Sequence, residues 1–253
     1  MIPVVSLVEA KTVLSPYRYS IISTRAEGLA GRLLRWGAEH YRNYPWRNPP
    51  RLSYSILVAE LLLKRTTATA ASRVYHEFLA KYPTVGDLAQ AELRELEQIL
   101  ARVGLQRQRA DAFRAVALHI VRHEGGEVPC TLERLLRIPH VGAYTACAIL
   151  SFACGVPVPV VDSNFTRFIT RVFATTLGPS PRPEEVWAAA RTVLPEGQHA
   201  EFNYAVLDFA GIVCRYGQPR CLHCIINDLC DWYKATSIRA LQSIKDMINF
   251  AAE

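Results

Sequence analysis

The stretch RIPHVGAYTACAI, residues 137–149, decides the fold of this chain. A proline and a glycine in Pro-x-x-Gly spacing mark a tight turn, and the apolar run after them has helical spacing. We expect a short helix over residues 131–138 and a second helix over residues 143–154, with Tyr144 just inside it. The stretch therefore predicts a helix–hairpin–helix.

Backbone N–H groups in such a turn, together with the N-terminus of the next helix, favour an anion such as a DNA phosphate. The turn residues expected to face the DNA are His140, Val141 and Gly142. An ordinary loop between two packed helices is the alternative interpretation, so the hairpin alone does not assign a function.

Helical periodicity extends over most of the chain. Besides the hairpin, helices are expected over residues 24–42, 54–63, 87–103, 109–124, 163–174, 184–193 and 199–213. The apolar stretch GVPVPVV (155–161) contains two prolines, which argue against a central strand. The expected fold class is all-α.

The composition is that of a folded protein with one large or two modest domains, since half of the 253 residues are hydrophobic. No apolar run reaches the roughly 20 residues that cross a bilayer, and the apolar start is too short for a secretory signal. We expect a soluble, monomeric protein of a prokaryotic cytoplasm, associated with the nucleoid and without a membrane partner.

The net charge is +6, and 24 arginines outnumber 5 lysines. Guanidinium groups bind phosphate oxygens in pairs and keep their charge, so this balance favours a nucleic-acid partner. A solvated basic surface with no partner is the alternative.

Four of the seven cysteines form one segment with the spacing C-x6-C-x2-C-x5-C: Cys214, Cys221, Cys224 and Cys230. Clustered thiolates in an intracellular protein indicate a metal site, and the spacing alone leaves zinc and an iron–sulfur cluster both open. The other three cysteines, Cys130, Cys147 and Cys154, are expected to be small core residues.

Two acidic residues are candidates for catalysis. Glu60 is the only charged residue of the apolar stretch YSILVAELLL (54–63), where burial disfavours a charged carboxylate. It suits general acid work, and a structural cap or an arginine pair is the alternative. Asp162 precedes an amphipathic helix and is expected to be its N-cap, ionised because the helix N–H groups favour the charged form.

The order of these features resembles the helix–hairpin–helix DNA glycosylase superfamily, in its iron–sulfur branch of endonuclease III, adenine mismatch glycosylases and thymine–guanine mismatch glycosylases. The resemblance covers roughly residues 24–233. It includes the hairpin, the cysteine segment, YPWR (44–47), AELLLKRTTA (59–68), VGLQRQRA (103–110) and VDSNFTR (161–167).

The resemblance implies a two-lobed all-α fold with a C-terminal [4Fe–4S] cluster loop, because the cysteine spacing matches the loop of that family. Residues 44–155 would form a helical barrel domain with the hairpin, and residues 21–43 would join residues 156–235 in a cluster domain. Residues 1–20 would be an N-terminal extension and residues 236–253 a C-terminal helical extension.

The implied partner is double-stranded DNA with a mismatched or damaged base, bound in a cleft between the lobes and flipped out of the helix. The residues that match strand-penetrating positions are Lys64, Arg65, Gln106 and Arg107, and a solvated loop is the alternative for the last two. Further DNA contacts are expected from Asn164, Arg167, Arg215 and Arg220.

Tyr144 stands where endonuclease III has its catalytic lysine. A phenol cannot form a Schiff base, and no lysine lies between Lys81 and Lys234 to replace that amine. The resemblance therefore implies a monofunctional glycosylase without lyase activity. His140 departs from the family pattern, which usually has glycine there, so the phosphate contact of the hairpin is in question.

With tyrosine at this position, the chain looks most like the thymine–guanine mismatch enzymes, which remove thymine or uracil opposite guanine. Asp162 would stabilise the positive charge on the sugar and orient or deprotonate the attacking water. Glu60 would assist departure of the base, and Tyr144 would contact the flipped nucleotide. The alternatives are an adenine mismatch glycosylase without its 8-oxoguanine recognition domain and a non-catalytic DNA-binding module.

Overall fold

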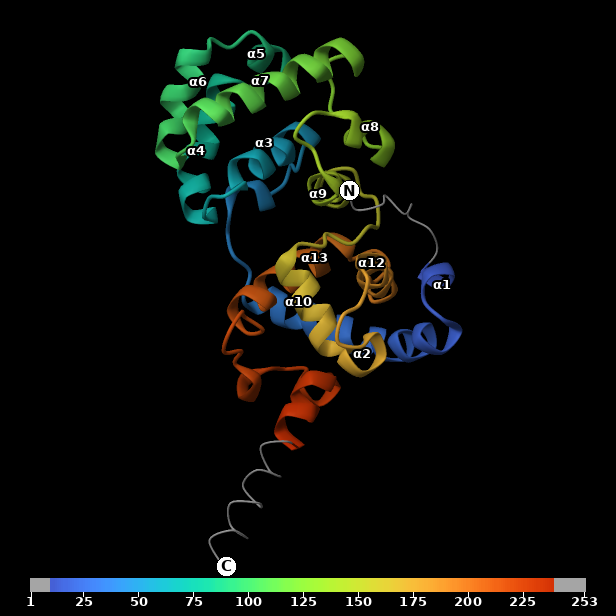
Figure 1. Cartoon of the computed structure of the whole chain (residues 1–253). Coiled ribbons are helices and arrows are strands. Elements are labelled where there is room, and N and C mark those ends of the chain that lie inside the picture. Colours follow the sequence, from blue (N-terminus) through green and yellow to red (C-terminus); the bar gives the residue numbers. More distant parts are fainter. Residues whose placement is uncertain (1–9, 239–253) are drawn as a thin grey trace, which may run out of the picture. The chain divides into compact units, whose positions relative to one another are not determined.

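The computed structural model describes residues 10–238, which divide into two compact units. One unit contains residues 42–156, and the other joins the chain before residue 42 to the chain after residue 156. Figure 1 shows helices throughout both units, and no strand occurs within the described range. The expected all-α class is confirmed.

The unit of residues 42–156 carries the hairpin. Its helices are η1 (Pro45–Arg47), α3 (Ser53–Leu63), α4 (Ala68–Lys81), α5 (Val85–Ala89), α6 (Leu93–Leu100), η2 (Ala101–Val103), α7 (Gln106–His123), α8 (Leu132–Arg137) and α9 (Ala143–Phe152). Helix α3 packs against α4 and α9, and α7 packs against α5 and α6. The expected barrel domain, residues 44–155, lies inside this unit.

The second unit combines the two ends of the chain. Its labelled helices are α1 (Ala10–Val13), α2 (Pro16–Glu39), α10 (Ser163–Val172), α11 (Ala174–Leu177), α12 (Pro183–Thr192), α13 (His199–Ile212), η3 (Cys221–His223) and η4 (Asn227–Leu229), and residues 231–238 are helical as well. Phe165, Phe168, Phe202 and Phe209 lie in its core. Gly37 lets α2 approach α13 closely, because a Cβ there would lie 2.6 Å from the Cβ of Ala205.

Several helix boundaries differ from those expected. The interval 87–103 contains three short helices, because a Thr84–Asp87 capping box starts α5 and the chain turns at Gln90 before α6. Helix α2 begins earlier, at Pro16, where Ser15 caps it. Helix α4 was not expected, although its buried residues have the spacing of an amphipathic helix: Ala71, Val74, Tyr75 and Phe78.

Two of the three scattered cysteines are not core residues. Cys130 and Cys154 form a disulfide, whereas Cys147 is buried with a free thiol, as expected. Helices α8 and α9 lie between the two bonded positions, so the disulfide closes a loop that contains the entire hairpin. A separation of 24 residues gives no pairing signal in the sequence.

Within residues 10–238, no helix is long and apolar enough to cross a membrane. The expected N-terminal extension is described only from residue 10. Most of the expected C-terminal helical extension lies outside the described residues.

Candidate active site and DNA-binding surfaces

The hairpin turn connects α8 to α9 over residues 138–142. The side chain of Val141 is buried, so only its backbone can reach a ligand, while His140 and Gly142 are exposed. His140 has φ +62°, a left-handed conformation that glycine adopts without cost. This left-handed conformation explains why the family usually has glycine at the position of His140. Histidine is among the non-glycine residues that adopt the left-handed region more readily than most.

Lys64 connects the end of α3 to this turn. It is the C-cap residue of α3, and its Nζ donates a hydrogen bond to the backbone oxygen of His140. Desolvation lowers the pKa of the ammonium, and the carboxylate of Glu60 acts in the opposite direction. The Lys64 side chain therefore supports the hairpin turn.

The remaining expected strand-penetrating residues are exposed. Arg65 follows α3, whereas Gln106 and Arg107 begin α7. The side chain of Arg107 is 86% exposed. Leu105, which was not expected to be a site residue, is an exposed leucine with φ +54° and lines the same pocket as Arg65, whose φ is +55°. An exposed leucine in a left-handed turn is unusual, and only the structure reveals that conformation.

Glu60 lies in α3 with 6% of its surface exposed, as the apolar sequence around it predicted. Tyr144 is half-buried in the first turn of α9, the helix against which α3 packs. Both residues thus belong to the unit of residues 42–156.

Asp162 belongs to the other unit and is the N-cap of α10, as expected. Its Oδ1 accepts a 2.7 Å hydrogen bond from the backbone N–H of Phe165, and its Oδ2 accepts a 2.8 Å bond from the Asn164 side chain. Both side-chain oxygens of Asp162 are thereby held in a fixed orientation by hydrogen-bond donors.

Asn203, which no sequence pattern had indicated, fixes the backbone that leads to Asp162. It is fully buried on α13, accepts a 3.0 Å bond from the Val160 N–H and donates a 2.9 Å bond to the Val158 oxygen. This segment is neither helix nor strand, so the side-chain amide of Asn203 satisfies two backbone groups that secondary structure leaves unpaired.

Arg167 continues the hydrogen-bond chain from Asp162 toward the cysteines. Its Nη2 donates to Asn164 Oδ1 at 3.1 Å and to the Ala210 oxygen at 2.7 Å, and its Nε donates to the Cys214 oxygen at 2.9 Å. Asn164 and Arg167, expected as DNA contacts, thus have well-defined internal partners.

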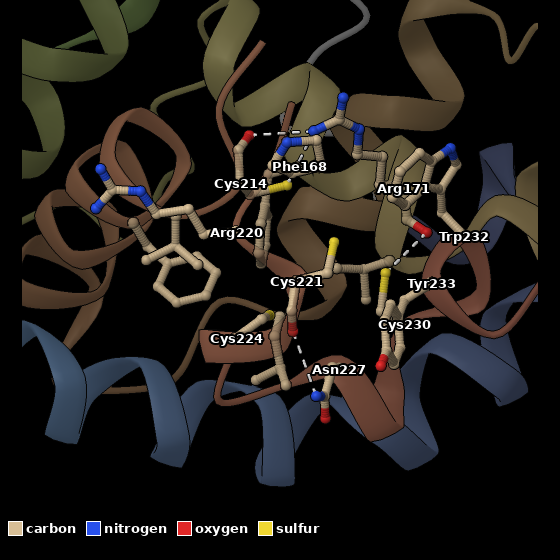
Figure 2. Close-up of a pocket in the computed structure, with 15 residues that line it drawn as sticks. Phe168, Arg171, Cys214, Arg220, Cys221, Cys224, Asn227, Cys230, Trp232 and Tyr233 are labelled. Carbon is tan, nitrogen blue, oxygen red and sulfur yellow. Dashed lines mark hydrogen bonds between the residues drawn. The ribbon is translucent and has the colours of Figure 1, made fainter. Parts of the chain in front are cut away.

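The four clustered cysteines line a single cavity of about 20 Å³. Figure 2 shows their sulfur atoms around this cavity, with Arg171 and Trp232 at its edge. Burial raises the pKa of the Cys224 thiol to about 12 and also raises the pKa of Cys221 and Cys230, and the neighbouring thiols act in the same direction. A bound metal cation has the opposite effect, because it lowers the pKa of a cysteine thiol and favours the thiolate. The four cysteines are therefore suitable ligands for a metal-containing centre.

Among residues 10–238, no group of three or more His, Cys, Asp or Glu side chains is arranged to hold a metal ion. Arg171 reaches this site from α10, where its Nη1 lies 3.5 Å from the Cys214 sulfur.

Residues 58–196 match the HhH-GPD superfamily of base excision DNA repair proteins, and the chain belongs to this family. Among curated proteins it is 38% identical over 219 residues to the thymine-DNA glycosylase of Aeropyrum pernix, covering 83% of this chain and 96% of that protein. It is 33% identical to the thymine/uracil-DNA glycosylase of Methanothermobacter thermautotrophicus, covering 80% and 91% of the two chains. A solved thermostable thymine-DNA glycosylase superimposes with a TM-score of 0.79 at 31% identity, covering 84% and 98%.

Proposed function

We propose that this protein is a monofunctional DNA glycosylase that removes thymine or uracil mispaired with guanine. The observation that carries the proposal is Tyr144 in the first turn of α9, together with the likeness to the thymine and thymine/uracil glycosylases. A tyrosine supplies no amine for a Schiff base, so the sugar–phosphate backbone stays intact.

Asp162 carries the central step. As the glycosidic bond breaks, positive charge develops on the deoxyribose, and a fixed carboxylate stabilises it. The bonds from Phe165 and Asn164 hold Asp162 in one orientation, and the carboxylate can accept a proton from the attacking water. The water oxygen bonds to the sugar carbon, and the bonding electrons leave with the base.

Glu60 and Tyr144 act on the flipped nucleotide. Glu60, buried on α3, would hydrogen-bond the flipped base or assist its departure. Tyr144 offers a ring face and a hydroxyl to the nucleotide, without taking part in bond formation.

Mismatched double-stranded DNA is the partner we propose. The hairpin turn binds a phosphate through backbone N–H groups, while Arg65, Leu105, Gln106 and Arg107 extend toward the gap left by the flipped base. Arg215 and Arg220 would add positive charge near the phosphates of the DNA backbone.

The cysteine segment is proposed to hold a [4Fe–4S] cluster through Cys214, Cys221, Cys224 and Cys230. The cluster would supply structural support and a charged centre to this loop. Arg171 would then lie next to its first ligand, where a guanidinium offsets the negative charge of the thiolates.

The test is to identify the base released from duplexes that contain T·G, U·G, A·G or A·8-oxoguanine, using mass spectrometry. We expect thymine and uracil to be released. Release of adenine alone would favour an adenine mismatch glycosylase. Tight binding without release from any duplex would indicate a DNA-binding module.

A further inference from the structure

Arg109 is a buried cation whose bonding the proposed chemistry does not use. It lies in the first turn of α7 with 6% of its surface exposed. Its Nη1 donates to the oxygens of Leu61 at 2.9 Å and Leu62 at 3.2 Å, near the end of α3, where backbone oxygens lack helical partners. Positive charge is also favourable at that helix end.

The same guanidinium bonds to two separate turns. Nη2 donates to the Lys64 oxygen and to the Thr66 hydroxyl in the 64–66 turn. Nε donates to the Gly104 oxygen at 2.8 Å in the 104–105 turn. One side chain therefore joins two loops that lie about forty residues apart in the sequence.

Both turns contain a non-glycine residue in the left-handed region, Arg65 in one and Leu105 in the other. Such conformations persist only where surrounding bonds fix them. A pocket of about 120 Å³ lies between the turns, with Arg65, Leu105 and Arg109 among its lining residues. Arg109 thus connects the two turns beneath the pocket.

We propose that Arg109 is a positioning residue that fixes the 64–66 turn and the 104–105 turn relative to each other before DNA binds. This inference rests on the proposed function, because these turns carry the residues that occupy the gap left by the flipped base. Because only 6% of its surface is exposed, Arg109 would act through these turns rather than through a DNA contact. Its five donors in a rigid plane meet five acceptors, and a lysine ammonium has only three donors on a flexible stem.

The test compares Arg109→Lys and Arg109→Met with Arg122→Met, an exposed arginine on the same helix. Thr66→Val is the milder variant, because it keeps Arg109 and removes one of its five acceptors, together with the 3.1 Å bond from the Thr66 hydroxyl to the Val103 oxygen. Single-turnover release of thymine is measured at saturating protein, once with T·G and once with the target thymine in a one-nucleotide bulge. Each variant is first shown by circular dichroism to be folded at the assay temperature.

We expect Arg109→Lys to slow release from T·G at least tenfold but from the bulge less than threefold, because an unpaired base needs less help to stay flipped. Thr66→Val should act in the same direction with a smaller loss, and Arg122→Met should change neither rate. Equal losses on both substrates, or no loss on T·G, would overturn the inference.

A second readout separates this inference from the proposed function. Fluorescence of 2-aminopurine beside the mismatch reports opening of the duplex without any chemistry. If wild-type protein raises this fluorescence but releases no base, the proposed function fails while Arg109 remains testable. The inference is then overturned if Arg109→Lys raises the fluorescence as strongly as wild type does.

Discussion

Arg167 donates a 2.9 Å hydrogen bond from its Nε to the backbone oxygen of Cys214. Through Asn164, the same guanidinium also connects to the carboxylate of Asp162. The proposed catalytic carboxylate and the first cysteine of the proposed cluster are therefore linked by three consecutive hydrogen bonds within one unit.

Arg167→Gln should disturb both Asp162 and the backbone of Cys214, which lie at the two ends of this hydrogen-bond chain. Loss of a hydrogen bond to a charged group costs about 1.5–3 kcal/mol, so we expect base release to slow by about ten- to a hundredfold. Iron content should fall as well, because the Cys214 backbone loses its anchor. Iron analysis and single-turnover kinetics on the same preparation check both effects, and normal values of both would refute the link.

Asp162→Asn should abolish base release and preserve DNA binding. The amide keeps the size of the side chain and still offers one oxygen to the Phe165 N–H, but it carries no negative charge for the sugar cation. We expect a loss of at least a hundredfold in rate, with affinity for a T·G duplex within about threefold of wild type. A variant that retains full activity would exclude Asp162 as the catalytic carboxylate.

The His140→Gly substitution should stabilise the left-handed backbone conformation of the hairpin turn. Glycine adopts φ +62° without the steric cost that histidine pays, of order 1 kcal/mol. The melting temperature should rise or stay unchanged, and affinity for undamaged duplex should not fall. A fall in affinity at constant stability would instead show that the imidazole contacts DNA directly.

The Cys130–Cys154 disulfide should stabilise the unit that contains the hairpin. Closing a loop of this length contributes about 3 kcal/mol in the chain-entropy model. We expect Cys130→Ser with Cys154→Ser to lower the melting temperature by roughly 6–12 °C. Reductant should lower the melting temperature of wild type toward that of the double variant and leave the variant itself unchanged. Equal sensitivity of both proteins to reductant would show that the disulfide contributes nothing.

Much of the fold follows from local sequence pattern. Apolar residues with helical spacing indicated α7, α9 and α13, and the Pro-x-x-Gly turn indicated the hairpin. Helix α4 has the same spacing at Ala71, Val74 and Phe78 and was overlooked. The Cys130–Cys154 pair instead depends on a hairpin that brings distant residues together. Contacts of that kind carry no local signal.

Some residues of the candidate site were likewise recognisable from the sequence, whereas others were not. Glu60 was recognisable as a charge in an apolar helix, and Asp162 as a helix cap. Arg109 and Asn203 were not recognisable, because their significance lies in the backbone oxygens and N–H groups that they meet after folding. Leu105 was missed because its exposure depends on a left-handed turn.

The most direct test of the central claim uses an end-labelled T·G duplex incubated with the protein and then divided, with one half treated with alkali. Hydrolysis of the glycosidic bond leaves an abasic site that alkali cleaves, and Tyr144 provides no amine to cleave it earlier. We predict strand breaks at the mismatched thymine only in the alkali-treated half. Breaks without alkali, or an intact strand in both halves, would contradict the assignment of a monofunctional thymine glycosylase.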